Sequence, residues 1–125
     1  MLRFVRVAAI AAVTIMLASG SGSGAARAGD WTEVSNQGQS HLVVVATPKE
    51  ADRRVYQDAI RKLCPAGQQC FIFFWNSDGP VPTHFPFSKA ENDAMVANYV
   101  VNPQKKYRQI IWNCRIDPDP NVCFK

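Results

Sequence analysis

Three short apolar runs alternate with two segments of helical spacing along most of the chain. The runs are Leu42 to Ala46, Cys70 to Trp75, and the residues Ile110, Ile111 and Trp112 within Arg108 to Arg115. Apolar runs of this length predict strands that are buried on both faces. Trp31 to Val34 predicts a further short strand at a sheet edge.

The segment between the first two runs has the spacing of an amphipathic helix. Apolar residues recur at every fourth position (Ala51, Val55, Ala59 and Leu63), which predicts a helix over residues 48–63. Thr47 is the expected N-cap, followed by Pro48 at the first helical position and by Glu50 three residues after the cap. The opposite face carries charges of alternating sign (Glu50, Arg54, Asp58 and Lys62), which is typical of a solvated helix face.

A second helix is expected to begin at Ser88. Ser88-Lys89-Ala90-Glu91 repeats the capping-box pattern. Ala90, Ala94, Ala97 and Val101 continue a narrow apolar stripe, and Asn102-Pro103 ends it. The second helix is therefore expected to reach about residue 101.

The predicted fold class is a small single α/β domain in (β)βαβαβ order. Helices between successive strands favour parallel pairing through right-handed crossovers. We therefore expect a mainly parallel sheet of three to four strands with two helices, stapled by two disulfides. A helix on each face of the sheet is one arrangement; coverage of one face by loops or by a partner is the alternative.

The first twenty-eight residues have the pattern of a secretory signal peptide. Arg3 and Arg6 precede a mostly apolar stretch from Val7 to Ala18, and Ala26-Arg27-Ala28 is a small-x-small cleavage pattern. The apolar stretch is shorter than the roughly 20 residues that a membrane span requires. We expect cleavage after Ala28, no stable membrane anchor afterwards, and a periplasmic or secreted domain over residues 29–125.

Cleavage also changes the charge. The whole chain has 14 Lys and Arg against 10 Asp and Glu, but Arg3, Arg6 and Arg27 leave with the signal. The remaining balance of 11 to 10 gives a net charge of +1, with the two signs mixed along the chain. Nucleic acid is therefore not an expected partner, since its recognition requires a concentrated basic surface.

Four cysteines in a short exported domain predict two disulfides. Three pairings are open. Cys64–Cys70 and Cys114–Cys123 are favoured, because each pair brackets a short segment that contains proline, although the longer-range pairings would constrain the unfolded chain more. The spacings match neither a Cys-x-x-Cys redox pair nor a structural zinc site, so no cofactor is expected.

The Pro-rich segment after the second strand is the candidate site. Ligands of parallel α/β folds bind outside the carboxyl ends of the strands, which is where residues 78–88 are expected to lie. Asp78, Thr83, His84 and Phe85 are the candidate binding residues there. The structural alternative is that the phenylalanines of this loop only cap the core. His41, directly before a strand, has no accompanying motif.

Two further patterns have structural interpretations. Asp117-Pro118-Asp119-Pro120-Asn121 matches the first three ligand positions of a calcium loop, but the required Gly and the bidentate Glu are missing. A rigid acidic turn closed by Cys114–Cys123 is the favoured interpretation. Trp75 and Trp112 lie inside predicted strands, so core packing is favoured over a stacking platform for carbohydrate or peptide.

Two functional hypotheses can be argued from residues of this sequence, beside a purely structural envelope-stress role that no residue tests. No nucleophile elbow, paired-His metal motif or glycine-rich phosphate loop is present. The favoured hypothesis is a small exported binding or accessory protein without catalytic activity that uses the 78–88 loop for a protein, peptide or envelope carbohydrate. The alternative is a small hydrolase with His84 as general base, oriented by Asp78 or Asp93.

Overall fold

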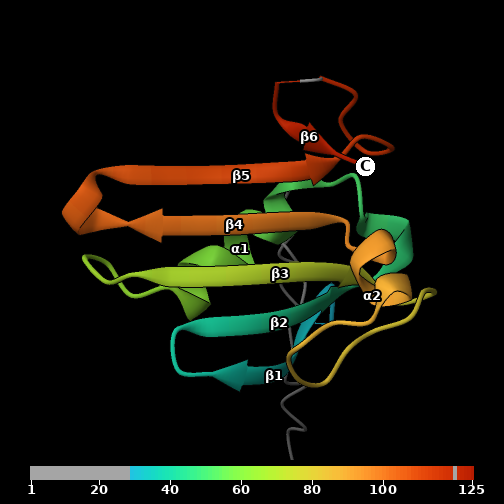
Figure 1. Cartoon of the computed structure of the whole chain (residues 1–125), viewed down its shortest axis with the longest axis horizontal. Helices are drawn as coiled ribbons and strands as arrows, with labels where there is room; N and C mark the ends of the chain where they lie inside the picture. The colour runs from blue at the N-terminus through green and yellow to red at the C-terminus, as the bar shows by residue number, and fades with distance from the viewer. Residues whose placement is uncertain (1–28, 120) are drawn as a thin grey trace, which may run out of the picture.

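The computed structural model describes residues 29–119 and 121–125, and within them six strands form one mixed sheet (Figure 1). Its spatial order, β1-β2-β3-β4-β5-β6, follows the order along the chain. The strands are β1 (Trp31–Gln37), β2 (Ser40–Val45), β3 (Cys70–Asn76), β4 (Ala97–Asn102), β5 (Tyr107–Asn113) and β6 (Cys123–Phe124). The helices are α1 (Arg53–Leu63) and α2 (Lys89–Ala94), with two 3-10 turns, η1 (Thr47–Lys49) and η2 (Pro103–Lys105).

The expected mainly parallel sheet of three to four strands is wrong. Of the five strand pairs in the described part of the chain, only β2–β3 and β5–β6 are parallel. The other three pairs, β1–β2, β3–β4 and β4–β5, are antiparallel. In the described part of the chain, α1 forms the helical crossover that returns the chain from the end of β2 to the start of β3.

The error arises at residues 97–102, which were expected to extend the second helix and instead form β4. Helix α2 has only six residues and is about 9 Å long at 1.5 Å per residue. It is too short to carry the chain back along the seven residues of β3, so β4 runs antiparallel to that strand.

The predicted start of the second helix is confirmed, whereas that of the first helix is wrong. The capping box at Ser88 is confirmed: its hydroxyl accepts a hydrogen bond from the Glu91 amide, and the Glu91 carboxylate accepts one from the Ser88 amide. Thr47 does not cap the first helix. It begins η1, whereas α1 begins six residues later behind Asp52, whose side chain accepts from the Arg54 amide.

The amino-terminal edge strand is confirmed and is longer than expected. β1 extends to Gln37 and pairs with β2 through a tight turn at Gly38 and Gln39. Gly38 has φ of +62°, in the left-handed region that short hairpin turns require and that glycine adopts without a steric penalty.

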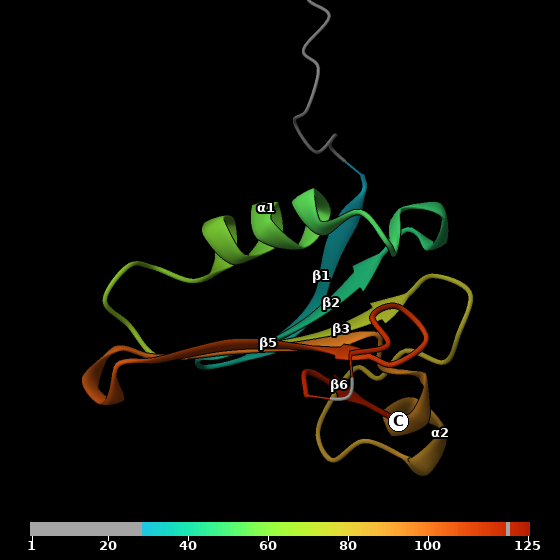
Figure 2. The ribbon, with the colours of Figure 1, turned by 90° about the horizontal axis from the view of Figure 1, so that it is seen from above.

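Helix α1 covers one face of the sheet, as Figure 2 shows. Its buried residues Val55, Tyr56 and Ala59 pack on the sheet residues that point to this face. The Tyr56 ring makes edge contacts with Phe74 and Trp112, at centroid distances of 4.8 and 4.6 Å. This layer is the main core. Trp112 lies in it, in agreement with the core interpretation of that residue.

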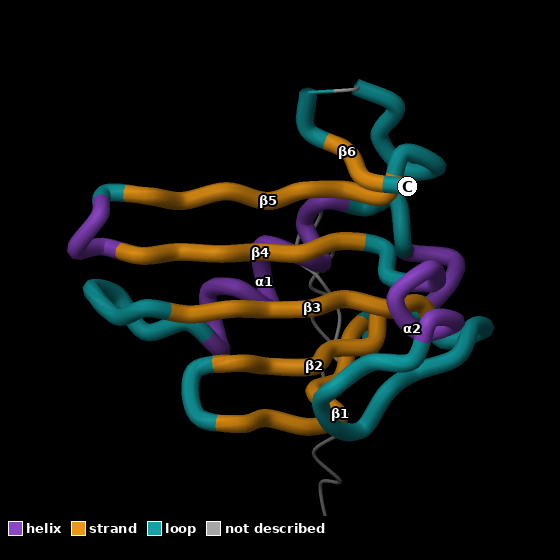
Figure 3. Tube along the Cα trace, in the orientation of Figure 1, coloured by secondary structure: helices purple, strands orange, loops and turns teal. Residues whose placement is uncertain are grey.

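The opposite face is covered mainly by loop. Leu42, Trp75 and Met95 form a smaller buried cluster beneath α2 and the 77–88 segment. Figure 3 shows that segment as the long loop that joins β3 to α2. Trp75 is 1% exposed and donates a hydrogen bond from Nε1 to the Glu91 carbonyl, so it is a core residue and no stacking platform.

Both favoured disulfides are confirmed. Cys64–Cys70 joins the end of α1 to the start of β3, and Cys114–Cys123 joins the end of β5 to β6. Each bridge encloses a short loop, because its first cysteine directly follows one element and its second cysteine begins the next strand.

Candidate functional site

The 77–88 segment is held at both ends. The Asn76 side-chain oxygen accepts hydrogen bonds from the amides of Asp78 and Gly79, at 3.2 and 3.0 Å. At the other end, the capping box of Ser88 and Glu91 fixes the entry into α2. These bonds determine where the loop leaves and rejoins the folded body.

Aromatic packing holds the middle of the loop. Phe85 and Phe87 contact Phe73 of β3 at centroid distances of 5.5 and 5.4 Å, and Phe87 also contacts Trp75 at 5.0 Å. Edge-to-face pairs of this kind contribute about 0.5–1.5 kcal/mol each beyond the area they bury. Phe85 is thus an anchor of the loop, as the structural alternative for these phenylalanines expected.

The tip of the loop is polar and exposed. Thr83 and His84 both face solvent, and Thr83 Oγ1 lies 3.2 Å from His84 Nδ1. Asp78 is exposed in the turn that starts the loop. Of the four candidate residues, the structure therefore brings Thr83 and His84 together and leaves Asp78 and Phe85 in other roles.

No carboxylate of the described residues orients His84. Asp93 instead accepts a hydrogen bond from Lys89 at 2.7 Å, and the side chain of Asp78 makes no hydrogen bond to the imidazole. A general base needs a partner or a cleft that positions it against its substrate. Among the residues described, no carboxylate holds the His84 imidazole in place.

The other histidine has the carboxylate partner. His41 Nδ1 lies 2.7 Å from Glu33 Oε2, and Asn36 donates to Glu33 Oε1 at 2.8 Å. The sequence pattern does not predict this pair, because the expected first strand ends at Val34 and the observed one at Gln37. A hairpin centred on Gly38 would have placed Glu33 near His41, on the same face of the sheet. Since the Glu33 carboxylate is hydrogen-bonded to both Asn36 and the His41 imidazole, we assign these three residues a structural role in the β1–β2 hairpin.

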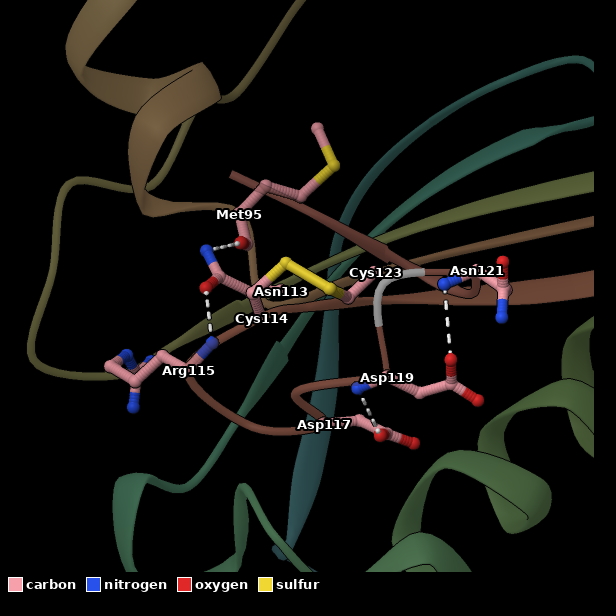
Figure 4. The surroundings of a disulfide bond; sticks show 8 residues. All are labelled: Met95, Asn113, Cys114, Arg115, Asp117, Asp119, Asn121 and Cys123. Atoms are coloured by element: carbon pink, nitrogen blue, oxygen red, sulfur yellow. Dashed lines mark hydrogen bonds between the residues drawn. A yellow bond between two sulfur atoms is a disulfide. The ribbon is translucent and has the colours of Figure 1, made fainter.

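The acidic carboxyl-terminal turn uses its side chains locally. In Figure 4 the carboxylates of Asp117 and Asp119 accept hydrogen bonds from the amides two residues further on, those of Asp119 and Asn121. Asp117 also pairs with Arg53 at 2.7 Å, and this hydrogen bond lowers the pKa of the Asp117 carboxyl. The turn is closed by Cys114–Cys123, as predicted.

A second ion pair ties this carboxyl-terminal segment to the body. Arg115 holds the Glu50 carboxylate with two hydrogen bonds of 2.7 and 3.1 Å, and this lowers the pKa of Glu50. The Glu50 carbonyl accepts a hydrogen bond from the Tyr56 hydroxyl at 2.7 Å, and burial raises the pKa of that hydroxyl. The network joins η1, α1 and the segment after β5, and every group in it has a structural partner.

An open groove of about 510 Å³ lies on the α1 face of the sheet. One side is formed by the last turns of α1 and the following loop, and the other by β4 and β5. Its sheet residues are Tyr99, Val101 and Arg108, of which Val101 and Arg108 are direct neighbours across β4 and β5. The sequence pattern does not reveal this groove, because it predicts a helix over Tyr99 and Val101, which lie in β4.

The described residues include no cluster of three or more His, Cys, Asp or Glu that would hold a metal ion. No helix in that part of the chain is both long and apolar enough to cross a membrane. Comparison of the chain with protein-family models, with curated proteins and with solved structures found no match.

Proposed function

We propose that the protein is a small exported binding protein without catalytic activity, and that the tip of the 78–88 loop is its contact surface for a partner protein. The proposed signal lies in residues 1–28, outside the described residues. Two disulfides in the rest of the chain are in keeping with an oxidising compartment.

The observation that carries the proposal is a polar tip on a fixed loop. Thr83 and His84 are exposed, while Phe85 and Phe87 beside them are packed against the sheet. Pro82, directly before the tip, is buried. Association is costly when it must order a mobile segment, and a loop already held in one conformation avoids much of that cost.

The tip also has the chemistry of a recognition surface. Its hydroxyl and imidazole supply both donors and acceptors, and the exposed Pro86 adds rigid apolar surface next to them. A compact polar feature with an apolar border suits a protein surface, whose contacts combine apolar area with a few hydrogen bonds. Partner contacts are expected to fall on Thr83, His84 and Pro86.

Site-specific crosslinking tests the proposal. A photoreactive amino acid such as p-benzoylphenylalanine replaces Thr83, and the protein is expressed in its own cells and exported. We expect the exported form to begin at Gly29 and to form one discrete crosslinked adduct with another protein on irradiation. His84→Ala in the same background should reduce the yield of that adduct severalfold, because the neighbouring contact is lost.

The matched control carries the same photoreactive residue at Gln104, an exposed position at the opposite end of the sheet. It should not form the adduct. Equal adducts from positions 83 and 104, or an adduct unaffected by His84→Ala, would contradict the proposal. Adducts to carbohydrate alone would reject a protein partner.

A further inference from the structure

We propose that the groove on the α1 face binds a small amphipathic anion, namely a carboxylate carried on an apolar chain or ring. The site is independent of the 78–88 loop, which covers the opposite face of the sheet (Figure 2). Three features of the groove carry the inference: its apolar floor, an arginine without an ion-pair partner among the described residues, and a tyrosine hydroxyl that bonds to none of them.

The floor of the groove is apolar and only partly covered. Ile60 of α1 and Val101 of β4 are half-buried against the main core, and Tyr99 of β4 lines the groove with them. The volume of about 510 Å³ falls within the range of about 300–1,000 Å³ that is typical of small-molecule sites. A chain or ring of small-molecule size would cover this apolar surface.

Arg108 supplies a positive charge that the protein does not neutralise. Among the described residues it is the arginine without a carboxylate partner, because the other four are each in an ion pair (Arg53–Asp117, Arg54–Asp52, Arg61–Asp58 and Arg115–Glu50). Arg61 lines the same groove, and none of the lining residues is acidic. The electrostatic environment therefore favours a negatively charged ligand.

Tyr99 adds a polar group at the floor. The residue is 5% exposed, and its hydroxyl makes no hydrogen bond to any group in the described part of the chain. The hydroxyl oxygen itself is reached by solvent, because no fully buried side-chain polar atom of the described residues lacks a partner, so it is available to a ligand in the groove. A carboxylate can accept a hydrogen bond from the Tyr99 hydroxyl and two from a guanidinium such as that of Arg108.

The test uses matched ligands of one chain length. Octanoate, octanol and octylammonium are titrated into the disulfide-bonded protein, with binding followed by amide chemical shifts and by calorimetry. We expect saturable octanoate binding with shifts at Tyr99, Val101 and Arg108, weaker binding of octanol, and no binding of octylammonium. Octanoate binding should weaken as salt is raised, since the groove is open to solvent.

Variants assign the effect to the groove. Arg108→Gln should weaken octanoate binding about tenfold, as expected for the loss of one charge-assisted contact, and Arg108→Lys should retain part of the affinity. Tyr99→Phe should weaken it severalfold with the ring in place. Lys105→Gln removes a nearby charge outside the groove and should change nothing.

Several outcomes overturn the inference: no saturable octanoate binding, octanol or octylammonium binding as tightly as octanoate, or unchanged affinity in Arg108→Gln. His84→Ala should leave octanoate binding intact. Failure of the groove is thereby distinguished from failure of the loop, which the crosslinking experiment measures.

Discussion

At the scale of single residues, Asp58 links the edge of the sheet to the helix that covers it. The residue is 6% exposed, and its carboxylate accepts hydrogen bonds from Trp31 Nε1 at 2.9 Å, Arg61 at 2.7 Å and Lys62 at 3.0 Å. The hydrogen bond from Trp31, followed by that from Lys62, holds the pKa of Asp58 below its usual value. A residue that was expected on a solvated helix face is therefore a buried connection between β1 and α1.

The lowered pKa predicts how Asp58→Asn changes stability with pH. The stabilisation from the ionised carboxylate is complete above the pKa in the unfolded chain, near 4, and is lost as pH falls through the lower pKa of the folded protein. We expect Asp58→Asn to lower the free energy of unfolding by about 1–2 kcal/mol at pH 7, with the difference from the natural protein shrinking as pH falls through the lowered pKa of the folded protein.

Urea unfolding between pH 7 and pH 2 measures this difference. Asp93→Asn is the control, because Asp93 forms only an exposed pair with Lys89 and its loss should have little effect. A constant difference between Asp58→Asn and the natural protein at all pH values would show that the charge of Asp58 is not what stabilises the fold.

At the scale of elements, residues 97–102 show where sequence patterns stop being decisive. Ala97 and Val101 fit a helical stripe with Ala90 and Ala94, yet Ala97, Tyr99 and Val101 also alternate as a strand does, and all three face α1. Consecutive Tyr and Val residues favour a strand. So short a segment, however, fits the helical repeat of 3.6 residues and the strand repeat of two residues equally well. The neighbouring strands β3 and β5 decide the outcome through long-range pairing.

The candidate sites differ in the same way, because one depends on local sequence signals and the other on long-range strand pairing. Local signals sufficed for the Ser88 capping box and for the loop that Thr83 and His84 occupy. The groove requires Val101 to lie beside Arg108, which depends on the antiparallel pairing of β4 with β5. A side-chain neighbourhood created by strand pairing is not visible until the strands themselves are assigned.

The capping box makes α2 a testable element. Six residues are too few for a stable isolated helix, so α2 depends on its cap and on packing. Ser88→Ala should lower the free energy of unfolding by about 1 kcal/mol and change the near-UV signal of Trp75, which bonds the Glu91 carbonyl. Lys89→Ala, in the same turn, should leave both nearly unchanged; equal effects of the two substitutions would contradict a role for the cap.

At the scale of the whole molecule, strands that are neighbours in the chain are neighbours in the sheet. The turns that join β1 to β2 and β4 to β5 are short, whereas the α1 crossover and the 77–96 connection between β3 and β4 are long. The disulfides extend this pattern, since they close loops with sequence separations of 6 and 9 residues. Short spacing around proline is why the bridges were predictable when the strand directions were not.

The two disulfides should nevertheless contribute unequally to stability. The loop-entropy estimate is about 2–3 kcal/mol for each, but Cys70 is 1% exposed in the main core, whereas Cys123 is half-buried in a two-residue strand. We expect Cys64→Ala with Cys70→Ala to cost at least about 2–3 kcal/mol of unfolding free energy. Cys114→Ala with Cys123→Ala should cost less, because β6 can open locally without unfolding the sheet.

Urea unfolding measures the global cost, and hydrogen exchange at the Trp112 amide reports the local opening, because that amide donates to the Val122 carbonyl at 3.1 Å. In the variant without Cys114–Cys123, exchange at Trp112 should accelerate much more than exchange in β3. In the variant without Cys64–Cys70, protection should fall throughout the sheet, because the staple between α1 and β3 is part of the main core. The expectation fails if both variants lose the same unfolding free energy and the Trp112 amide stays protected without Cys114–Cys123. That result would mean that β6 unfolds together with the sheet.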